Sequence, residues 1–200
     1  MGEATRSLSE GKFFLNISKK IKKANKQFWK YVDRALANAY NYVKFSHRPI
    51  DNHKILMLTS RGTYNCHPRA IADEIIRQNL PYEIVWVVRK ENIDNHEWYP
   101  ENLKLVQRGS YEFYEEAATS KVWIDNSVTF SYLFAKKRKE QVLFETWHGS
   151  FGLKKFDASV NNNKYWVKKA YQEGKQTDYC LTNCKFEENL FKGTFWENTE

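Results

Sequence analysis

The sequence lacks long apolar runs, patterned cysteines and an excess of glycine or proline. No stretch approaches the roughly 18 apolar residues that a membrane-spanning helix requires, and residues 1–12 contain no apolar core of the signal-peptide kind. The three cysteines, Cys66, Cys180 and Cys184, show no repeated spacing, so we expect neither a disulfide framework nor a zinc site. Eight glycines and four prolines argue against disorder. We therefore expect a globular protein that is neither secreted nor lipid-anchored and that folds in a reducing compartment.

Positive charge is in excess only in the N-terminal quarter of the chain. Of 32 lysines and arginines and 24 acidic residues, residues 1–50 contain 11 and 3, which leaves 21 of each for residues 51–200. A body without net charge gives no support for general nucleic-acid binding. The chain is 42% hydrophobic and 16% aromatic, which is enough to bury a core. We predict a basic arm, residues 1–50, followed by one folded domain, residues 51–200.

Residues 13–45 are predicted to form one amphipathic helix. Apolar residues recur at three- and four-residue steps from Ile17 to Ala39, and lysines occupy the opposite side. A basic face opposite an apolar face is typical of a helix that lies in a membrane interface. Packing on the chain's own domain and nucleic-acid binding are the alternatives. The residues predicted to contact the membrane are Lys19, Lys22, Lys23, Lys26, Lys30 and Phe28.

Beyond residue 53 the pattern changes to strands that alternate with helices. This alternation predicts an α/β fold, a Rossmann-like parallel sheet with flanking helices. In the helix at 111–118, the acidic residues Glu112, Glu115 and Glu116 are expected to be exposed. The predicted strands are 54–59, 83–88, 103–107, 122–125, 142–144 and 178–181, and the predicted helices are 68–78, 111–118, 165–171 and 186–191.

A histidine follows the fifth predicted strand, at the point where that strand should stop. Ligands of open α/β sheets bind outside the carboxyl ends of the strands, so His148 is well placed for chemistry. Imidazole is the side chain that most readily exchanges a proton near neutral pH, and Gly149 and Gly152 allow the backbone to turn tightly beside it. Arg61 and Asn126 also follow strand ends, so we expect them to share a cleft with His148. The alternative is a histidine that only caps this turn through a hydrogen bond to the backbone.

Several ordered motifs of the chain are similar to those of one known family. The segment Thr146-Trp-His-Gly-Ser150, with Leu153-Lys154-Lys155 after it, resembles the CDP-glycerol glycerophosphotransferase family, the teichoic-acid primases and polymerases of Gram-positive bacteria. The loop Arg61–Pro68 and the segment Trp123–Asn126 are also similar to that family. The resemblance covers residues 54 to about 192. It implies a two-domain, GT-B-like transferase, a peripheral protein at the cytoplasmic face of the cell membrane.

The resemblance also implies a reaction. Glycerol phosphate passes from CDP-glycerol to a hydroxyl of a lipid-linked acceptor, a teichoic acid or related cell-surface polymer, and CMP is released. CDP-glycerol is the donor substrate, no cofactor or metal is implied, and His148 takes the role of general base. In this family a second domain binds most of the donor, and this chain reaches Glu200 roughly where that domain would begin. We therefore expect the chain to be incomplete for turnover unless a longer product or a partner supplies the donor-binding half.

The same resemblance gives candidates for substrate binding. Arg61 and Lys154 either pair with phosphate or remain solvated surface charges. The turn at Asn65 either holds an acceptor phosphate at a helix N-terminus or only begins the helix. Asn126 is a candidate for a hydrogen bond to the acceptor glycerol, whereas Asp125 is expected to form a turn rather than bind a metal. The predicted substrate-binding residues are Arg61, Asn65, Asn126, Gly149, Ser150 and Lys154.

Other functions stay open on the sequence alone. One is a non-catalytic module at the membrane surface that binds the acceptor or a partner enzyme. Another is a ribitol-phosphate transferase of the same family, because the residues that choose between donors would lie in the second domain. A nucleic-acid binder is disfavoured by the neutral body and by the absence of a nucleic-acid motif.

Overall fold

A computed structural model of the chain describes most residues after position 40 and part of those before it. Internal contacts divide the chain into two compact units, residues 1–40 and residues 41–200. The described residues are 22–26, 28–29, 32–33, 35–37, 40–41, 43–133, 135–149 and 163–196.

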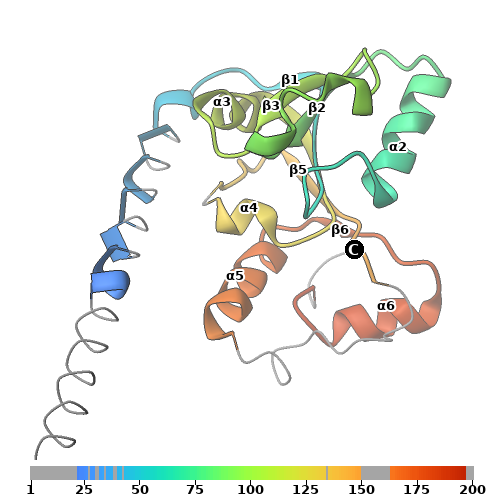
Figure 1. Ribbon diagram of the computed structural model, residues 1–200. Helices are drawn as coiled ribbons and strands as arrows, with labels where there is room; N and C mark the ends of the chain where they lie inside the picture. The colour runs from blue at the N-terminus through green and yellow to red at the C-terminus, as the bar shows by residue number, and fades with distance from the viewer. Residues whose placement is uncertain are drawn as a thin grey trace, which may run out of the picture. The chain divides into compact units, whose positions relative to one another are not determined.

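The first unit is helical at every described residue, as predicted (Figure 1). Two aromatic side chains on it, Phe28 and Trp29, are 56% and 61% exposed. No helix among the described residues is long and apolar enough to cross a membrane. Contact of this helix with a membrane surface stays a prediction. Of the residues predicted to make that contact, Lys22, Lys23, Lys26 and Phe28 are described and exposed, whereas Lys19 and Lys30 lie outside the described residues.

The second unit is built on a six-stranded parallel sheet in the order β3-β2-β1-β4-β5-β6 (Figure 1). All six predicted strands are present, and the predicted α/β, Rossmann-like fold is confirmed. The strands are β1 (Asp51–Leu58), β2 (Glu83–Val88), β3 (Lys104–Gln107), β4 (Ser120–Asp125), β5 (Val142–Glu145) and β6 (Tyr179–Cys180).

Helices connect the strands, and the four predicted ones are confirmed. A single-turn helix after β4 is not among the predicted elements, because four residues are too few to show a helical period. The helices are α2 (Cys66–Arg77), α3 (Tyr111–Thr119), α4 (Thr129–Tyr132), α5 (Lys164–Gly174) and α6 (Lys185–Lys192), with short 3-10 helices η1 (Lys90–Asn92) and η2 (His96–Trp98) between β2 and β3.

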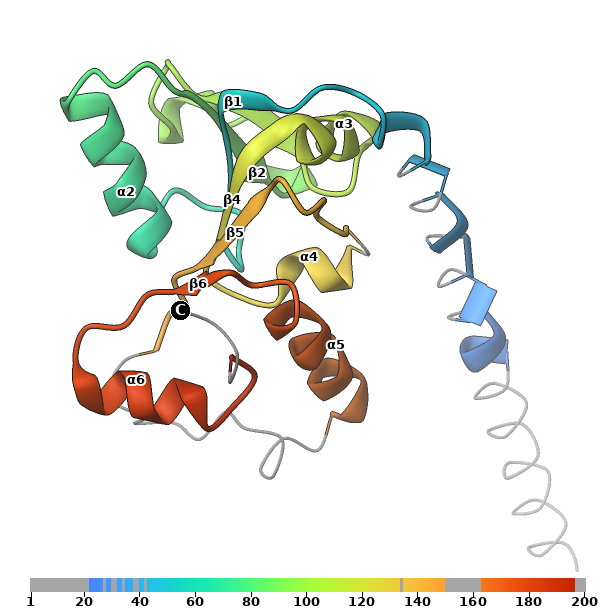
Figure 2. The same ribbon diagram turned by 180° about the vertical axis from the view of Figure 1, so that it is seen from behind.

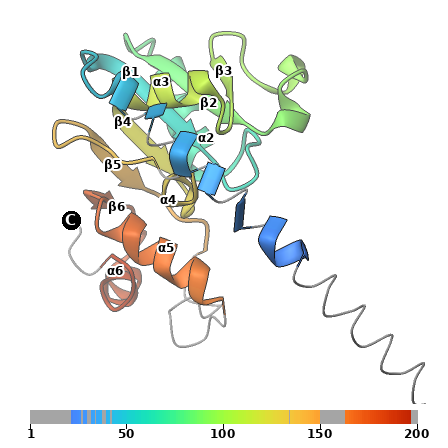
Figure 3. The same ribbon diagram turned by 90° about the vertical axis from the view of Figure 1, so that its left-hand side faces the viewer.

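Apolar cores lie on both faces of the sheet. Successive residues of a strand point to opposite faces, so Leu56 belongs to the core with Phe113 of α3, and Met57 to the core with Ala72 of α2. Strand β2 is buried along five of its six residues, which is typical of a parallel strand covered on both sides. A third core, which contains Trp196, lies at α5 and α6. Figures 2 and 3 show these two helices beside β6.

One prediction about α3 is wrong, because Glu116 is buried at 4% exposure. Its carboxylate lies 2.9 Å from the ammonium of Lys54 and 2.6 Å from that of Lys104. The residue lies on the face of α3 turned toward β1 and β3, and the two lysines of those strands offset the cost of burying its charge. Glu112 is exposed as predicted, and Glu115 is half-buried.

Gly174, the last residue of α5, is buried at a close approach between two segments. A Cβ atom at this position would lie 1.8 Å from the carbonyl oxygen of Phe195. Glycine to alanine in a helix normally stabilises by roughly 0.5–1 kcal/mol, but here the clash forces the backbone apart. We expect Gly174→Ala to lower the free energy of unfolding in urea by about 1–3 kcal/mol, the usual cost of overpacking.

The matched control is Gly193→Ala, at the end of α6. There the nearest atom to a new Cβ, the carbonyl oxygen of Leu190, is 3.6 Å away, and φ is −82°, which alanine adopts freely. We expect this variant to unfold like the wild-type chain. Equal stability of the two variants would contradict the close contact of Gly174 with Phe195.

Candidate active site

The candidate site lies where the strand order reverses. From β1 the sheet continues to β2 on one side and to β4 on the other. In open α/β sheets the loops at this reversal diverge, and ligands bind outside the carboxyl ends of the flanking strands. The loops that follow β1, β4 and β5 carry the predicted residues Arg61, Asn126 and His148. The structure therefore brings these three residues to the same edge of the sheet.

His148 is exposed and oriented by one hydrogen bond. Its Nδ1 lies against the main-chain carbonyl oxygen of Asn126. A carbonyl oxygen only accepts, so Nδ1 carries the proton, and Nε2 of the neutral ring has a lone pair that can accept one. The backbone contact that a purely capping histidine needs is present, yet it leaves the other ring nitrogen available for chemistry. The role of His148 as a base stays a prediction that this geometry favours.

Asn126 joins the loop after β1 to the loop after β5. Its side-chain Oδ1 accepts a 2.9 Å hydrogen bond from the Ser60 backbone N–H, and its carbonyl accepts from His148. The residue is 1% exposed. A hydrogen bond between Asn126 and an acceptor glycerol stays a prediction; in this structure its amide oxygen is engaged by Ser60.

The residue before the histidine has an unusual backbone. Trp147 has φ +50°, a left-handed backbone conformation that residues other than glycine seldom adopt. Its N–H donates to the Glu145 carboxylate at 2.7 Å, and its indole is buried, with the Trp196 ring 5.1 Å away. The Thr146 N–H donates to the Asp125 carbonyl at 2.8 Å. These contacts fix the turn that ends β5 and presents His148.

Three carboxyl groups are buried beneath this edge: Asp125 and Glu145 are 0% exposed, and Glu173 of α5 is 1% exposed. Asp125 accepts from the N–H groups of Asn126 and Thr129, both at 2.8 Å, as expected of a turn-forming residue. Burial and then the Glu173 charge raise the pKa of Asp125. Burial and then the Asp125 charge raise the pKa of Glu145. Burial raises the pKa of Glu173 to about 7.

Glu145 and Glu173 are not among the predicted site residues. Glu145 lies two residues after Leu143 in β5, so the two side chains point to the same face of the sheet, and both are buried. The period of the strand is therefore a signal that could have placed Glu145 inside. Glu173 lies in α5 and binds the start of α4: its carboxylate accepts from the N–H of Phe130 at 3.2 Å and of Ser131 at 2.6 Å. No local pattern connects residues 42 positions apart, so sequence alone gives no signal for this contact.

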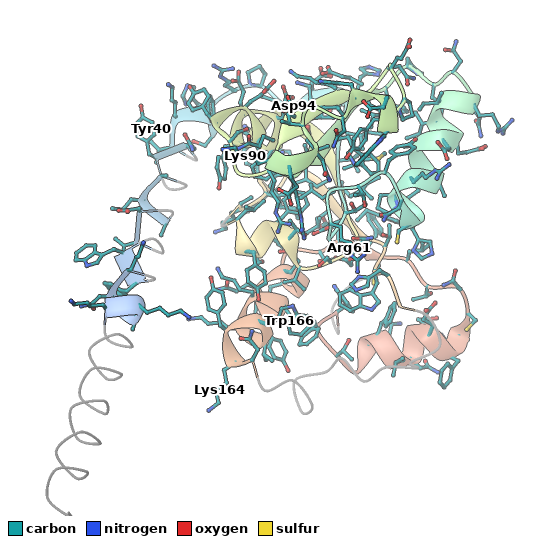
Figure 4. All side chains as sticks on the ribbon, in the orientation of Figure 1. Tyr40, Arg61, Lys90, Asp94, Lys164 and Trp166 are labelled. Atoms are coloured by element: carbon teal, nitrogen blue, oxygen red, sulfur yellow. The ribbon has the colours of Figure 1, made fainter. Side chains whose placement is uncertain are left out.

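The other predicted residues have different surroundings. Arg61 is exposed on the loop after β1 (Figure 4). Asn65 precedes α2 without capping it, and its side-chain amide donates instead to Thr63 Oγ1 at 2.9 Å. Gly149 is exposed next to His148. The predictions for Ser150 and Lys154 lie outside the described residues.

A second histidine, not predicted, adjoins the site. His67 stands in the first turn of α2, and its Nδ1 lies 3.4 Å from the Trp147 carbonyl oxygen. It also lines an apolar cavity of about 360 Å³ beside α2, together with Ile71, Ile75 and Leu181. In the part of the chain that the structure describes, no three His, Cys, Asp or Glu side chains are grouped so as to hold a metal ion.

The fold and the strand-end histidine define an α/β domain of the doubly wound type with its candidate site at the switch point. The sequence model of the family described as CDP-Glycerol:Poly(glycerophosphate) glycerophosphotransferase matches residues 40–200. The chain belongs to this family.

Curated relatives and solved structures agree with this assignment. The chain is 24% identical over 156 residues to the teichoic acid poly(glycerol phosphate) polymerase of Staphylococcus epidermidis, a match that covers 74% of this chain and 21% of that protein. It is 23% identical over 187 residues to the enzyme of that name from Bacillus subtilis (strain 168), with 90% and 24% covered. The structure of the wall teichoic acid polymerase TagF has a similar fold, with a TM-score of 0.62 at 18% identity over 82% of this chain and 44% of that one. The chain thus spans about a fifth to a quarter of the length of these curated relatives.

The buried carboxyls predict how stability depends on pH. Between pH 4.5 and about 7 the Glu173 carboxyl is protonated in the folded chain but ionised in the unfolded one. The unfolded state then binds fewer protons, so a rise in pH favours unfolding. In the wild type, the Glu173 carboxyl lowers the free energy of unfolding by up to roughly 3 kcal/mol as the pH rises through this window, at about 1.4 kcal/mol per pKa unit. We expect Glu173→Gln to remove this part of the pH dependence. Urea unfolding at a series of pH values measures it.

Glu188→Gln is the control for this experiment. Hydrogen bonds from Lys185 and Lys192 lower the pKa of Glu188 to about 2. Its contribution to the free energy of unfolding therefore changes with pH below 4.5 and not above it. We expect this variant to keep the wild-type slope between pH 4.5 and 7. Parallel curves for the wild type and Glu173→Gln would show that the Glu173 carboxyl is ionised in the folded chain.

Proposed function

We propose that this chain carries the acceptor-activating part of a glycerophosphotransferase. The reaction transfers glycerol phosphate from CDP-glycerol to a hydroxyl of a lipid-linked acceptor and releases CMP. Membership of the family supports the reaction class. The observation that carries the proposal is the hydrogen bond between His148 Nδ1 and the Asn126 carbonyl, because it leaves Nε2 as the proton acceptor at the ligand-binding edge.

In the proposed mechanism His148 acts as general base. The acceptor alcohol has a pKa far above 7, so its oxygen attacks phosphorus more readily if Nε2 removes the proton as the new P–O bond forms. The phosphoanhydride bond of CDP-glycerol breaks, and CMP leaves with its electron pair. A positioned base contributes typically 10²–10⁴-fold to the rate, and most of the remaining acceleration in phosphoryl transfer comes from positioning and charge stabilisation.

The donor is proposed to be CDP-glycerol rather than CDP-ribitol. The curated relatives named above are poly(glycerol phosphate) polymerases, which favours glycerol. We place donor binding in a second domain, supplied by a longer product or by a partner, because the similar TagF chain is more than twice the length that this chain covers.

The helical arm is proposed to hold the protein at the cytoplasmic face of the membrane, where a lipid-linked acceptor is found. Its described lysines and the aromatic residues Phe28 and Trp29 are exposed. Lysines bind anionic headgroups while aromatic side chains enter the interface. The proposed membrane contact is independent of the chemistry at His148.

The proposed base is tested by His148→Ala. We expect CMP release from CDP-glycerol to fall by roughly 10²–10⁴-fold, measured in this chain and in the longest natural product that contains it. His96→Ala is the control, since His96 is an exposed histidine of η2 on the same domain and should leave the rate unchanged. Full activity of His148→Ala would refute the assignment. A wild-type protein that binds the acceptor but never releases CMP in either form would favour the non-catalytic module.

The proposed membrane arm is tested by replacing three of its lysines with glutamine. Each lysine near an anionic leaflet contributes about 1 kcal/mol, so we expect roughly 100-fold weaker binding to phosphatidylglycerol vesicles. Co-sedimentation with vesicles measures it, and binding that is unchanged would contradict the proposed role of the arm. The altered lysines are Lys22, Lys23 and Lys26 of the arm, and the control set with the same change in charge is Lys164, Lys168 and Lys175, which are exposed in or next to α5.

A further inference from the structure

Three arginines follow the carboxyl ends of three neighbouring strands. Arg89 comes directly after β2, Arg108 directly after β3, and Arg61 lies in the loop after β1. These strands are adjacent in the sheet, so their ends lie along one edge, the edge at which this class of fold binds ligands. Only Arg61 stands out from the sequence, because the other two look like ordinary charges at the ends of strands.

Two of these arginines converge on one atom. The guanidinium of Arg89 donates to the Ser60 carbonyl oxygen at 3.0 Å, and that of Arg108 lies 3.5 Å from the same oxygen. Two cations that share an acceptor repel one another, and a bound anion relieves that repulsion. The Arg89 side chain is 43% exposed, and the nearest carboxylate oxygen, of Glu91, is 3.8 Å away. The arrangement is thus reachable from solvent and carries local positive charge.

The arginines are connected to the proposed base. The residue whose carbonyl they bind, Ser60, donates its N–H to Asn126, and the Asn126 carbonyl accepts from His148. Arg108 also lies within electrostatic reach of Asp125, whose pKa it lowers against the larger effects of burial and of Glu173. The positive charge therefore adjoins the site rather than standing apart from it.

We propose that Arg89, Arg108 and Arg61 form a phosphate site, here the arginine rim, that binds the phosphodiester of a polyol-phosphate acceptor next to the hydroxyl that His148 deprotonates. The inference rests on the proposed function and adds the recognition of the acceptor to it. In a glycerol-phosphate chain every terminal hydroxyl lies within one glycerol unit of a phosphate. An anion site beside the base would hold such a hydroxyl within its reach, and the planar, forked guanidinium matches a phosphate.

The test compares ligand binding in variants of the longest natural product that contains this chain, because donor binding is proposed to lie in a second domain. Arg89→Gln with Arg108→Gln is titrated by calorimetry with a short synthetic glycerol-phosphate oligomer and, separately, with CDP-glycerol. We expect the oligomer to bind at least tenfold more weakly and with a shallower salt dependence, while binding of CDP-glycerol is unchanged. The control pair, Arg69→Gln with Arg77→Gln, removes the same charge from exposed positions on α2 and should bind the oligomer like the wild type.

Several outcomes would overturn the proposal. Unchanged oligomer binding in the rim variant removes the arginine rim as a site, and a selective loss of CDP-glycerol binding assigns it to the donor instead. If both arginine pairs lose the same amount of oligomer binding, the effect comes from the net charge of the protein and not from a site. If the glutamine variant unfolds, Arg89→Lys with Arg108→Lys keeps the charge and removes the forked geometry, and it should still bind more weakly than the wild type.

Failure of the rim and failure of the proposed function are separable. His148→Ala should lose CMP release yet bind the oligomer like the wild type, because it leaves the arginines in place. Binding of the oligomer that depends on the rim, in a protein that never releases CMP, would retain the site and reject the transferase. A transferase that depends on His148 but tolerates both rim substitutions would retain the reaction and reject the site.

Discussion

Asn126 is the residue on which the geometry of the candidate site depends. It directly follows β4, and two of its polar groups join different loops. The side-chain oxygen accepts from the Ser60 N–H after β1, and the carbonyl accepts from His148 after β5. Buried hydrogen bonds are stronger than exposed ones and costly to leave unmade, and this residue is 1% exposed. The loop after β4 therefore holds in place the loops after its two neighbours in the sheet, β1 and β5. The hydrogen bond from Nδ1 to the Asn126 carbonyl also fixes the tautomer of the His148 imidazole.

The buried carboxyls hold the same loops from beneath, and they do so at a cost in stability. Each accepts backbone N–H groups at the end of a strand or the start of a helix, where the regular ladder supplies no partner. Asp125 serves the turn after β4, Glu145 the left-handed Trp147, and Glu173 the start of α4. Their raised pKa values reflect the desolvation involved. The turns that shape the site are thus ordered by groups that make the fold less stable as pH rises, a common exchange of stability for geometry.

Most of the fold could be predicted from the sequence, because its elements follow from local periodicity. The apolar run of β2 and the Pro68 helix start are visible within a few residues, and the alternation of strands and helices determines a parallel sheet. The position of His148 at a strand end follows from the same pattern. What could not be predicted depends on contacts between distant residues. Glu116 is buried only because two lysines of neighbouring strands meet it.

The arrangement of charge in residues 51–200 shows why net charge is a weak guide to local electrostatics. The equal numbers of basic and acidic residues in 51–200 give no support for a broad nucleic-acid surface. Charge that is balanced over a domain can still be separated within it. Acidic groups such as Glu173 are buried with raised pKa values, and others, such as Glu74, are neutralised by a neighbour on the same helix. The guanidinium groups of Arg89 and Arg108 meet at the strand ends. A phosphate group that reaches these strand ends meets positive charge, although the domain as a whole carries no net charge. The local arrangement therefore favours the binding of a single phosphate beside the proposed base.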